Sequence, residues 1–150
     1  MNVSKQTELI IREFEMNDYG PLIKLWQDAS LPYKPNGRDS REKMEAELKH
    51  GFGFILLAES EKKIIGAILG THDGRKGWIN RVAVHPDYRK QGIARKLVAE
   101  AEKRLEESGM EIITCLIEDW NEQSIEFFKR LGYNEQKDII YFSKKKHDKV

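Results

Sequence analysis

Apolar residues recur along the chain in six short segments whose patterns are typical of β-strands. The charged turn at residues 60–62 separates two of these segments and joins them into a hairpin. The fifth segment is apolar on both faces, as expected of a strand in the centre of a sheet. The expected strands are residues 9–14, 54–59, 63–71, 78–84, 112–118 and 139–143.

Four further segments place apolar residues at the three- and four-residue spacing of an amphipathic helix. The clearest of them brings Ile93, Leu97, Ala101 and Leu105 onto one face and stops at Gly109. The expected helices are residues 18–28, 40–50, 92–108 and 121–131. Together these elements predict the order β-α-α-β-β-β-α-β-α-β. That order is a mixed α+β fold in one domain, residues 1–150, with helices on both faces of the sheet.

Charge and cysteine content narrow the classes of partner. The 150 residues include 26 Lys and Arg and 25 Asp and Glu, so the net charge of +1 gives no electrostatic basis for binding nucleic acid or a membrane surface. The single cysteine, Cys115, cannot form an internal disulfide, and its apolar neighbours predict a buried thiol in a strand. The chain shows neither an apolar signal sequence nor a stretch near the ~20 apolar residues of a membrane span. We therefore expect a cytoplasmic protein with no nucleic-acid or membrane partner.

The most informative segment is the loop between the strand 78–84 and the helix 92–108. The first turn of a helix leaves four backbone amides without partners, and the helix dipole adds partial positive charge there. Together they form an anion site, and Gly92 lets the backbone approach an anion closely because it has no Cβ. With the strand 112–118 this is a βαβ unit, which places the loop at the carboxyl end of a strand, where open sheets bind ligands. The loop therefore predicts a diphosphate site.

Two sequence motifs occur in this region, in order and in the expected elements. The first is Arg89-x-x-Gly92-x-Ala94, and the second is Asn121-x-x-Ser124-x-x-Phe127-Phe128-x-x-Leu131-Gly132-Tyr133. The pair resembles the two main motifs of the GNAT superfamily, the N-acetyltransferases that use acetyl-CoA. The resemblance extends to the order of elements over nearly the whole chain. It implies a twisted, mostly antiparallel sheet in which the parallel strands 78–84 and 112–118 splay apart and hold acetyl-CoA between them.

The resemblance also implies which residues bind the cofactor. The backbone of Val82, Ala83 and Val84 would bind the pantetheine arm as an added strand does. Asn121 would contact the same arm, with Ser124 beside it. Phe128 occupies the position where many members carry a tyrosine that acts as general acid toward the departing thiolate. The loop and first helical turn would bind the pyrophosphate through the backbone of Arg89, Lys90, Gln91, Gly92, Ile93, Ala94 and Arg95.

Catalytic residues are less clearly indicated than cofactor residues. Since Phe128 cannot donate a proton, Tyr141 on the expected last strand and Tyr33 in the loop 30–38 are the candidate general acids. Glu118 is the carboxylate nearest the expected cleft, either as a general base or as a surface charge, and Asn80 could hold a water beside it.

Aromatic residues are the candidates for the pocket that admits the acceptor. Trp78 occupies the region where some members place a catalytic glutamate, and Tyr33 lies in the loop through which this fold usually admits the acceptor. Trp120 either lines the pocket or packs beside Asn121.

The expected function is acetyl transfer to a primary amine by direct attack in a ternary complex. The acceptor is a small molecule or the amine of a protein or peptide, and a backbone N–H at Val84 or its neighbour would stabilise the oxyanion. An acyl-CoA-sensing module without turnover is the alternative, and pairing of two copies is left open. The loop argues against a dinucleotide oxidoreductase, because it has one glycine where that fingerprint needs three. No metal is expected, because His72 and His85 lack partners at ligand spacing.

Overall fold

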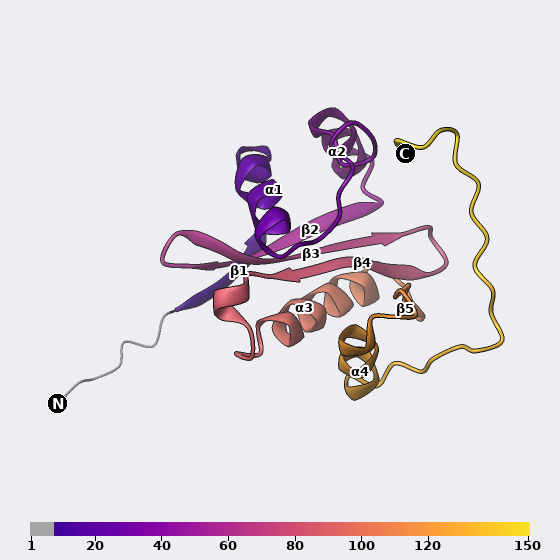
Figure 1. Cartoon of the computed structure of the whole chain (residues 1–150). Helices are drawn as coiled ribbons and strands as arrows, with labels where there is room; N and C mark the ends of the chain where they lie inside the picture. Colours follow the sequence, from indigo (N-terminus) through magenta and orange to yellow (C-terminus); the bar gives the residue numbers. More distant parts are fainter. Residues whose placement is uncertain (1–7) are drawn as a thin grey trace.

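A five-stranded mixed sheet forms the centre of the protein, as seen in a computed structural model that describes residues 8–150 (Figure 1). The strands follow one another across the sheet in chain order. Neighbouring strands are antiparallel except the last pair, which is parallel. The strands are β1 (Leu9–Glu13), β2 (Gly53–Ser60), β3 (Lys63–His72), β4 (Gly77–Val84) and β5 (Ile113–Cys115).

Helices cover both faces of this sheet, which confirms the predicted α+β architecture (Figure 1). One face carries α1 (Tyr19–Asp28) and α2 (Arg41–Lys49), and the other carries α3 (Ile93–Glu107) and α4 (Glu122–Arg130). Single 3-10 turns, η1 (Met16–Asp18) and η2 (Pro86–Tyr88), precede α1 and follow β4. The side chain of Ser40 starts α2 by accepting a hydrogen bond from the amide of Lys43.

Two apolar clusters fill the spaces between the sheet and its helices. On the α3 side, Ile65 and Ile68 pack against Leu97 and Leu105, and all four are at most 1% exposed. The cluster on the α1 side includes Leu22, Leu25, Trp26, Ile55 and Leu57. Neighbouring residues of β2 point alternately into the two clusters, so this strand is buried on both faces. The sheet therefore has its buried centre at β2 and β3.

The fifth predicted strand differs from expectation in both length and position. The prediction was a central strand over residues 112–118, but β5 covers only three residues and lies at the edge of the sheet. Ile112 and Leu116, which flank it, are 52% and 58% exposed. An apolar run on both faces was therefore wrong evidence for a central strand, because the pattern does not reveal how many neighbours a strand acquires.

The sixth predicted strand, residues 139–143, is not formed. After α4 the chain runs without regular structure past the β5 side of the sheet toward α2 (Figure 1). Its large apolar residues, Ile139 to Phe142, are 68–86% exposed. The segment has the composition of a strand, but it pairs with no strand among residues 8–150.

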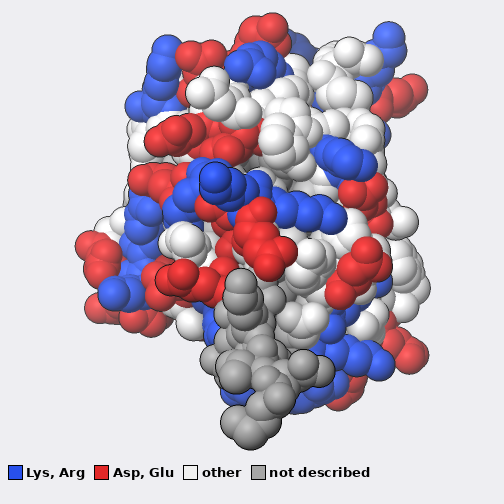
Figure 2. Space-filling view, turned by 90° about the vertical axis from the view of Figure 1, so that its left-hand side faces the viewer, with Lys and Arg blue, Asp and Glu red and all other residues white. Residues whose placement is uncertain are grey.

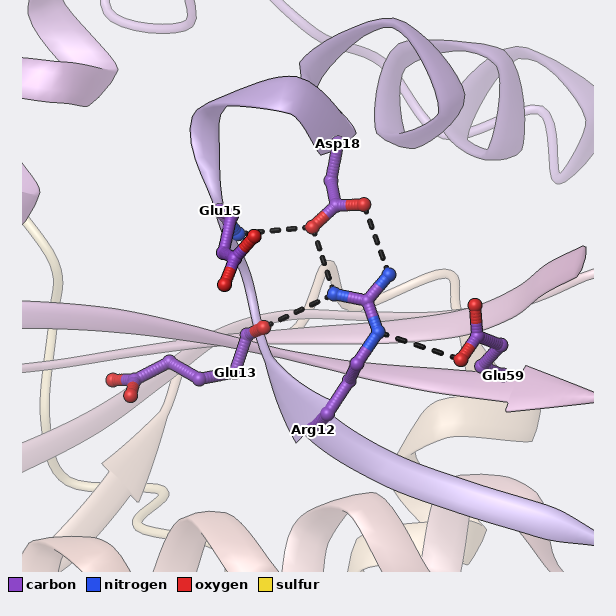
Figure 3. A network of polar contacts seen from close by, with 5 residues as sticks. All are labelled: Arg12, Glu13, Glu15, Asp18 and Glu59. Atoms are coloured by element: carbon purple, nitrogen blue, oxygen red, sulfur yellow. Dashed lines mark hydrogen bonds and ion pairs between the residues drawn. The ribbon is translucent and has the colours of Figure 1, made fainter. Parts of the chain in front are cut away.

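A polar network fixes the connection between β1 and α1 (Figure 3). Arg12 donates two hydrogen bonds to Asp18, at 2.8 and 2.9 Å, and lies 3.5 Å from Glu59 on β2. The carboxylate of Asp18 also accepts a hydrogen bond from the backbone amide of Glu15 at 2.9 Å. The hydrogen bonds from Arg12 hold the pKa of Asp18 below its usual value, although partial burial opposes them. The network thus ties the first strand to the first helix.

Candidate active site

A β-bulge in β4 shapes the site. Leu69 of β3 pairs with Arg81, and the next residue, Gly70, pairs with Ile79, so Asn80 is an extra residue in β4. Ile79 packs in the cluster on the α3 side. Asn80 and Arg81 both line a pocket on the opposite face, which Ile79 also reaches. The bulge therefore presents two consecutive polar side chains on one face of an otherwise apolar strand.

Beyond the bulge, β4 has a free edge. Its parallel pairing with β5 ends at Ile79 and Cys115, while β4 continues to Val84. Over Val82, Ala83 and Val84 the described chain pairs with β4 only on the β3 side. The expected opening between the two parallel strands is therefore present, and these three residues lie along it.

The loop that follows carries unpaired backbone amides at the start of α3. Within residues 8–150, the amides of residues 89–95 donate no hydrogen bond to backbone or side chain. Lys90 and Gly92 have left-handed backbone conformations, with φ of 64° and 78°. A Cβ at Gly92 would meet nothing within 4 Å, so the backbone is open to solvent on this side of Gly92. The loop has the features of an anion site.

Charged side chains surround this end of the molecule without forming a single-sign surface. Figure 2 views the side on which α3 begins, and it shows Lys and Arg interspersed with Asp and Glu. Arg89, Lys90 and Arg95 are exposed, so their cations can reach a phosphate bound at the amides.

Asn121 has a structural role that the sequence motif did not suggest. Its side-chain oxygen accepts the amide of Ser124 at 3.2 Å and thereby caps α4. The backbone N–H of Asn121 donates a hydrogen bond to the backbone carbonyl of Glu118 at 3.0 Å. The cap fixes the turn between β5 and α4. The predicted contact between Asn121 and the cofactor stays a prediction.

Phe128 lies in the core and has little free surface. It is 7% exposed, and its ring centroid lies 5.1 Å from those of Phe127 and Tyr133. The hydroxyl of Tyr133 donates to Glu102 at 3.0 Å. Burial, together with the nearby carboxylate, raises the pKa of Tyr133, which makes it a poor proton donor.

A pocket of about 300 Å³ opens on the α1–α2 face where β4 and β5 part. It brings together Trp78, Asn80 and Tyr141, which come from separate parts of the predicted site. The amide of Asn80 donates to the hydroxyl of Thr71 at 2.8 Å and is thereby oriented. The lining consists of Arg38, Asp39, Glu47, Leu69, Thr71, Trp78, Ile79, Asn80, Arg81, Leu116 and Tyr141.

Three other predicted residues are not part of this lining. Glu118 is exposed, and Trp120 is 74% exposed. The hydroxyl of Tyr33 is occupied by a hydrogen bond from Gln27 at 2.8 Å, and its ring packs 6.2 Å from that of Trp26.

Sequence reasoning missed a buried ion pair beside the pocket. Arg81 donates to both oxygens of Asp39 at 2.8 and 2.9 Å, and its guanidinium lies 4.5 Å from the ring of Trp26. The two charged side chains are only 10% and 6% exposed. Asp39 also accepts the amide of Lys34 at 2.6 Å, so the pair fixes the loop before α2. A lone arginine in the apolar strand 78–84 was the available signal.

The remaining chemistry of the described residues is limited. Burial raises the pKa of Cys115 to about 11, so this strand thiol is a weak nucleophile. Residues 8–150 contain no cluster of three or more metal-ligating side chains among His, Cys, Asp and Glu. In the same part of the chain, every helix is too short or too polar to cross a membrane.

Comparison with known proteins identifies the family. Residues 13–133 match the family model described as acetyltransferase (GNAT) family. An acetyltransferase from Sodalis glossinidius is 32% identical over 135 residues, which is 90% of this chain and 94% of that relative. An acetyltransferase from Photorhabdus laumondii is 32% identical over 136 residues, with the same two coverages.

Solved structures share the fold at lower identity. The aminoglycoside N-acetyltransferase AAC(6′)-Iy in complex with CoA has a TM-score of 0.78 at 18% identity, covering 95% of this chain and 99% of that chain. The PaiA N-acetyltransferase of Thermoplasma acidophilum, in complex with coenzyme A, has a TM-score of 0.75 at 19% identity, covering 86% and 91%. From the family match and its relatives, the chain belongs to the GNAT family of acetyltransferases.

Proposed function

We propose that this protein transfers the acetyl group of acetyl-CoA to a primary amine by direct attack in a ternary complex. The observation that carries the proposal is the continuity of two features. The unpaired amides of residues 89–95 adjoin the free edge of β4 at residues 82–84. The first feature suits the diphosphate of the cofactor and the second suits its extended pantetheine arm, which can add to the edge as a strand does.

This arrangement directs the thioester toward the β4 bulge. With the diphosphate at Gly92 and the arm along Val84 and Val82, the acyl end of the cofactor would point toward Asn80 and the pocket. The amine would attack the thioester carbonyl there, and a backbone N–H on the free edge of β4 next to that carbonyl would stabilise the oxyanion. The C–S bond then breaks and the sulfur leaves as a thiolate. Because a thiol has a pKa near 8.5, this leaving group is tolerable even without the usual tyrosine at Phe128.

The acceptor site supports a small amine. The pocket of about 300 Å³ is bounded by Arg38 and Asp39 of the loop before α2, by Trp78 of β4 and by Tyr141 of the C-terminal segment. A pocket of this size suits a compact molecule. The names of two fold neighbours, an aminoglycoside N-acetyltransferase and the PaiA N-acetyltransferase, also state transfer to nitrogen.

The experiment is a thiol-release assay with acetyl-CoA and a panel of primary amines, followed by mass spectrometry of the products. Amine-dependent release of CoA with a product heavier by one acetyl group supports the proposal. Binding of acetyl-CoA without thiol release from any small or peptide amine would instead indicate the sensing module. Absence of binding by the folded protein would contradict both functions.

A further inference from the structure

The charges lining the acceptor pocket leave one carboxylate without a partner. Asp39 and Arg81 satisfy each other through two hydrogen bonds, and Arg38 is exposed at the rim. Glu47, on the last turns of α2, is half-buried and lines the same pocket. Its carboxylate makes no hydrogen bond or ion pair with the described residues 8–150. The sequence gives no motif around Glu47, so only the packing of α2 on the sheet reveals it.

The position of Glu47 connects α2 to the β4 bulge. A Cβ on Gly53 would lie 3.0 Å from the Oε1 atom of Glu47 and 3.4 Å from the methyl group of Thr71. The carboxylate and the methyl group of Thr71 therefore both lie beside Gly53, and the hydroxyl of Thr71 accepts the hydrogen bond from Asn80. Glu47, Thr71 and Asn80 all line the pocket into which the acetyl group would be presented. Because Gly53 has no side chain, the carboxylate of Glu47 can lie against its backbone.

Burial gives this carboxyl group the properties of a proton acceptor. Partial burial raises the pKa of Glu47, the charge of Asp39 raises it further, and the charge of Arg81 acts in the opposite direction. Of the other titratable groups in the pocket, Arg38 lies on the exposed loop and Tyr141 on the C-terminal segment. A carboxylate with a raised pKa in a pocket is the usual setting of a general base.

We propose that Glu47 binds the ammonium group of the acceptor and removes its proton, so that the pocket selects compact alkylamines that are cationic at neutral pH. The inference rests on the proposed function and names the substrate class of the same site. Trp78 and Tyr141 add aromatic surface to the same pocket, and a cation is attracted to such rings. An alkyl amine with a pKa near 10.4 is almost entirely protonated at neutral pH and needs this base before it can attack.

The proton balance of the step is complete. One proton passes from the ammonium nitrogen to a carboxylate oxygen of Glu47, and the neutral nitrogen attacks the thioester carbonyl. The C–N bond forms, the C–S bond breaks, and the second proton lost from nitrogen goes to the departing sulfur. Glu47 then returns its proton to solvent, so that the products are the acetamide, CoA and one proton.

The test compares Glu47→Gln with Glu42→Gln, a matched change on an exposed position of the same helix. Both variants are assayed with 1,4-diaminobutane, which is cationic, and with aniline, which is uncharged at neutral pH. We expect Glu47→Gln to lower kcat/KM for the diamine by about 100-fold or more at pH 7.5, the lower end of a general-base contribution. The deficit should shrink as the pH rises toward the pKa of the diamine. Glu42→Gln should behave as the wild type.

Three outcomes would overturn the inference while the proposed function stands. They are wild-type rates for Glu47→Gln, an equal loss for diamine and aniline with no change in the pH profile, and a wild-type enzyme that acetylates only uncharged amines. Acetyl-CoA binding and the thermal unfolding midpoint of each variant, measured in parallel, show whether Glu47→Gln remains folded and loaded. If the wild type releases no CoA with any of the amines tested, it is the proposed function that fails.

Discussion

Loss of Arg81 should destabilise the protein more than loss of any exposed arginine. In Arg81→Met the carboxylate of Asp39 stays buried, with a 6% exposed side chain, and keeps only the hydrogen bond from the amide of Lys34. Removing one partner of a buried ion pair costs about 3–5 kcal/mol because the remaining charge is uncompensated. That is a large share of the 5–15 kcal/mol by which a typical domain is stable.

The assay is urea unfolding followed by far-ultraviolet circular dichroism, with linear extrapolation to water. Fluorescence is less suitable, because the ring of Trp26 lies 4.5 Å from the guanidinium that is removed. The matched control is Arg104→Met, whose ion pair with Glu13 joins side chains that are 40% and 61% exposed. Such an exposed pair contributes about 1 kcal/mol or less.

A second variant separates the unpaired charge from the lost contacts. Arg81→Met combined with Asp39→Leu removes both charges, so it should recover much of the stability that the single change loses. A loss below 1 kcal/mol for Arg81→Met, or a loss equal to that of Arg104→Met, would refute the reasoning. The reasoning would also be refuted if the double variant were less stable than Arg81→Met by as much as the loss of a second buried side chain costs.

Three further changes test other parts of the structure. The pKa of Asp18 is lowered by Arg12, so this pair stabilises the folded state fully above about pH 4 and progressively less as the pH falls through the lowered value. The stability difference between wild type and Arg12→Met, from urea unfolding, should therefore shrink between pH 7 and pH 3, and an unchanged difference would contradict this. Cys115, with a pKa of about 11, should resist a disulfide reagent at pH 8 until urea unfolds the chain; equal rates in both states would show an accessible thiolate. Phe128→Tyr should retain acetyl transfer and lose about 1–3 kcal/mol of stability, because the added hydroxyl enters a site that is 7% exposed. Complete loss of transfer in a folded variant that still binds CoA would refute that expectation.

Local elements were predictable because the information for them is local. The helix expected at 92–108 is observed as α3, and its start after Gly92 and its stop before Gly109 follow from residues within a few positions. The strand–loop–helix order likewise predicted the unpaired amides of residues 89–95, since an anion site of this kind uses consecutive backbone groups.

Features that depend on distant parts of the chain were not predictable in the same way. The segment 112–118 reads as a buried strand, yet its pairing is decided by β4 and ends at Cys115. The segment 139–143 has strand composition but finds no neighbour among the described strands.

The acceptor pocket shows the same limit. Glu118, the carboxylate expected nearest the cleft, is exposed and does not line the pocket. Glu47 reaches the pocket through the packing of α2, and Asp39 through an ion pair that spans 42 residues of sequence. The spacing of apolar and polar residues along the chain does not show that residues so far apart in sequence lie together.

The central claim is that the loop at Gly92 binds the diphosphate of acetyl-CoA, and isothermal titration tests it most directly. Wild type is compared with Gly92→Trp and with the control Gly109→Trp at the other end of α3. Both glycines have positive φ, 78° and 90°, and open space around the position of a Cβ, so both changes carry a similar strain of about 1 kcal/mol. The account predicts micromolar binding by wild type and by Gly109→Trp, and loss of binding in Gly92→Trp. Equal binding by all three proteins, or no binding by the folded wild type, would contradict it.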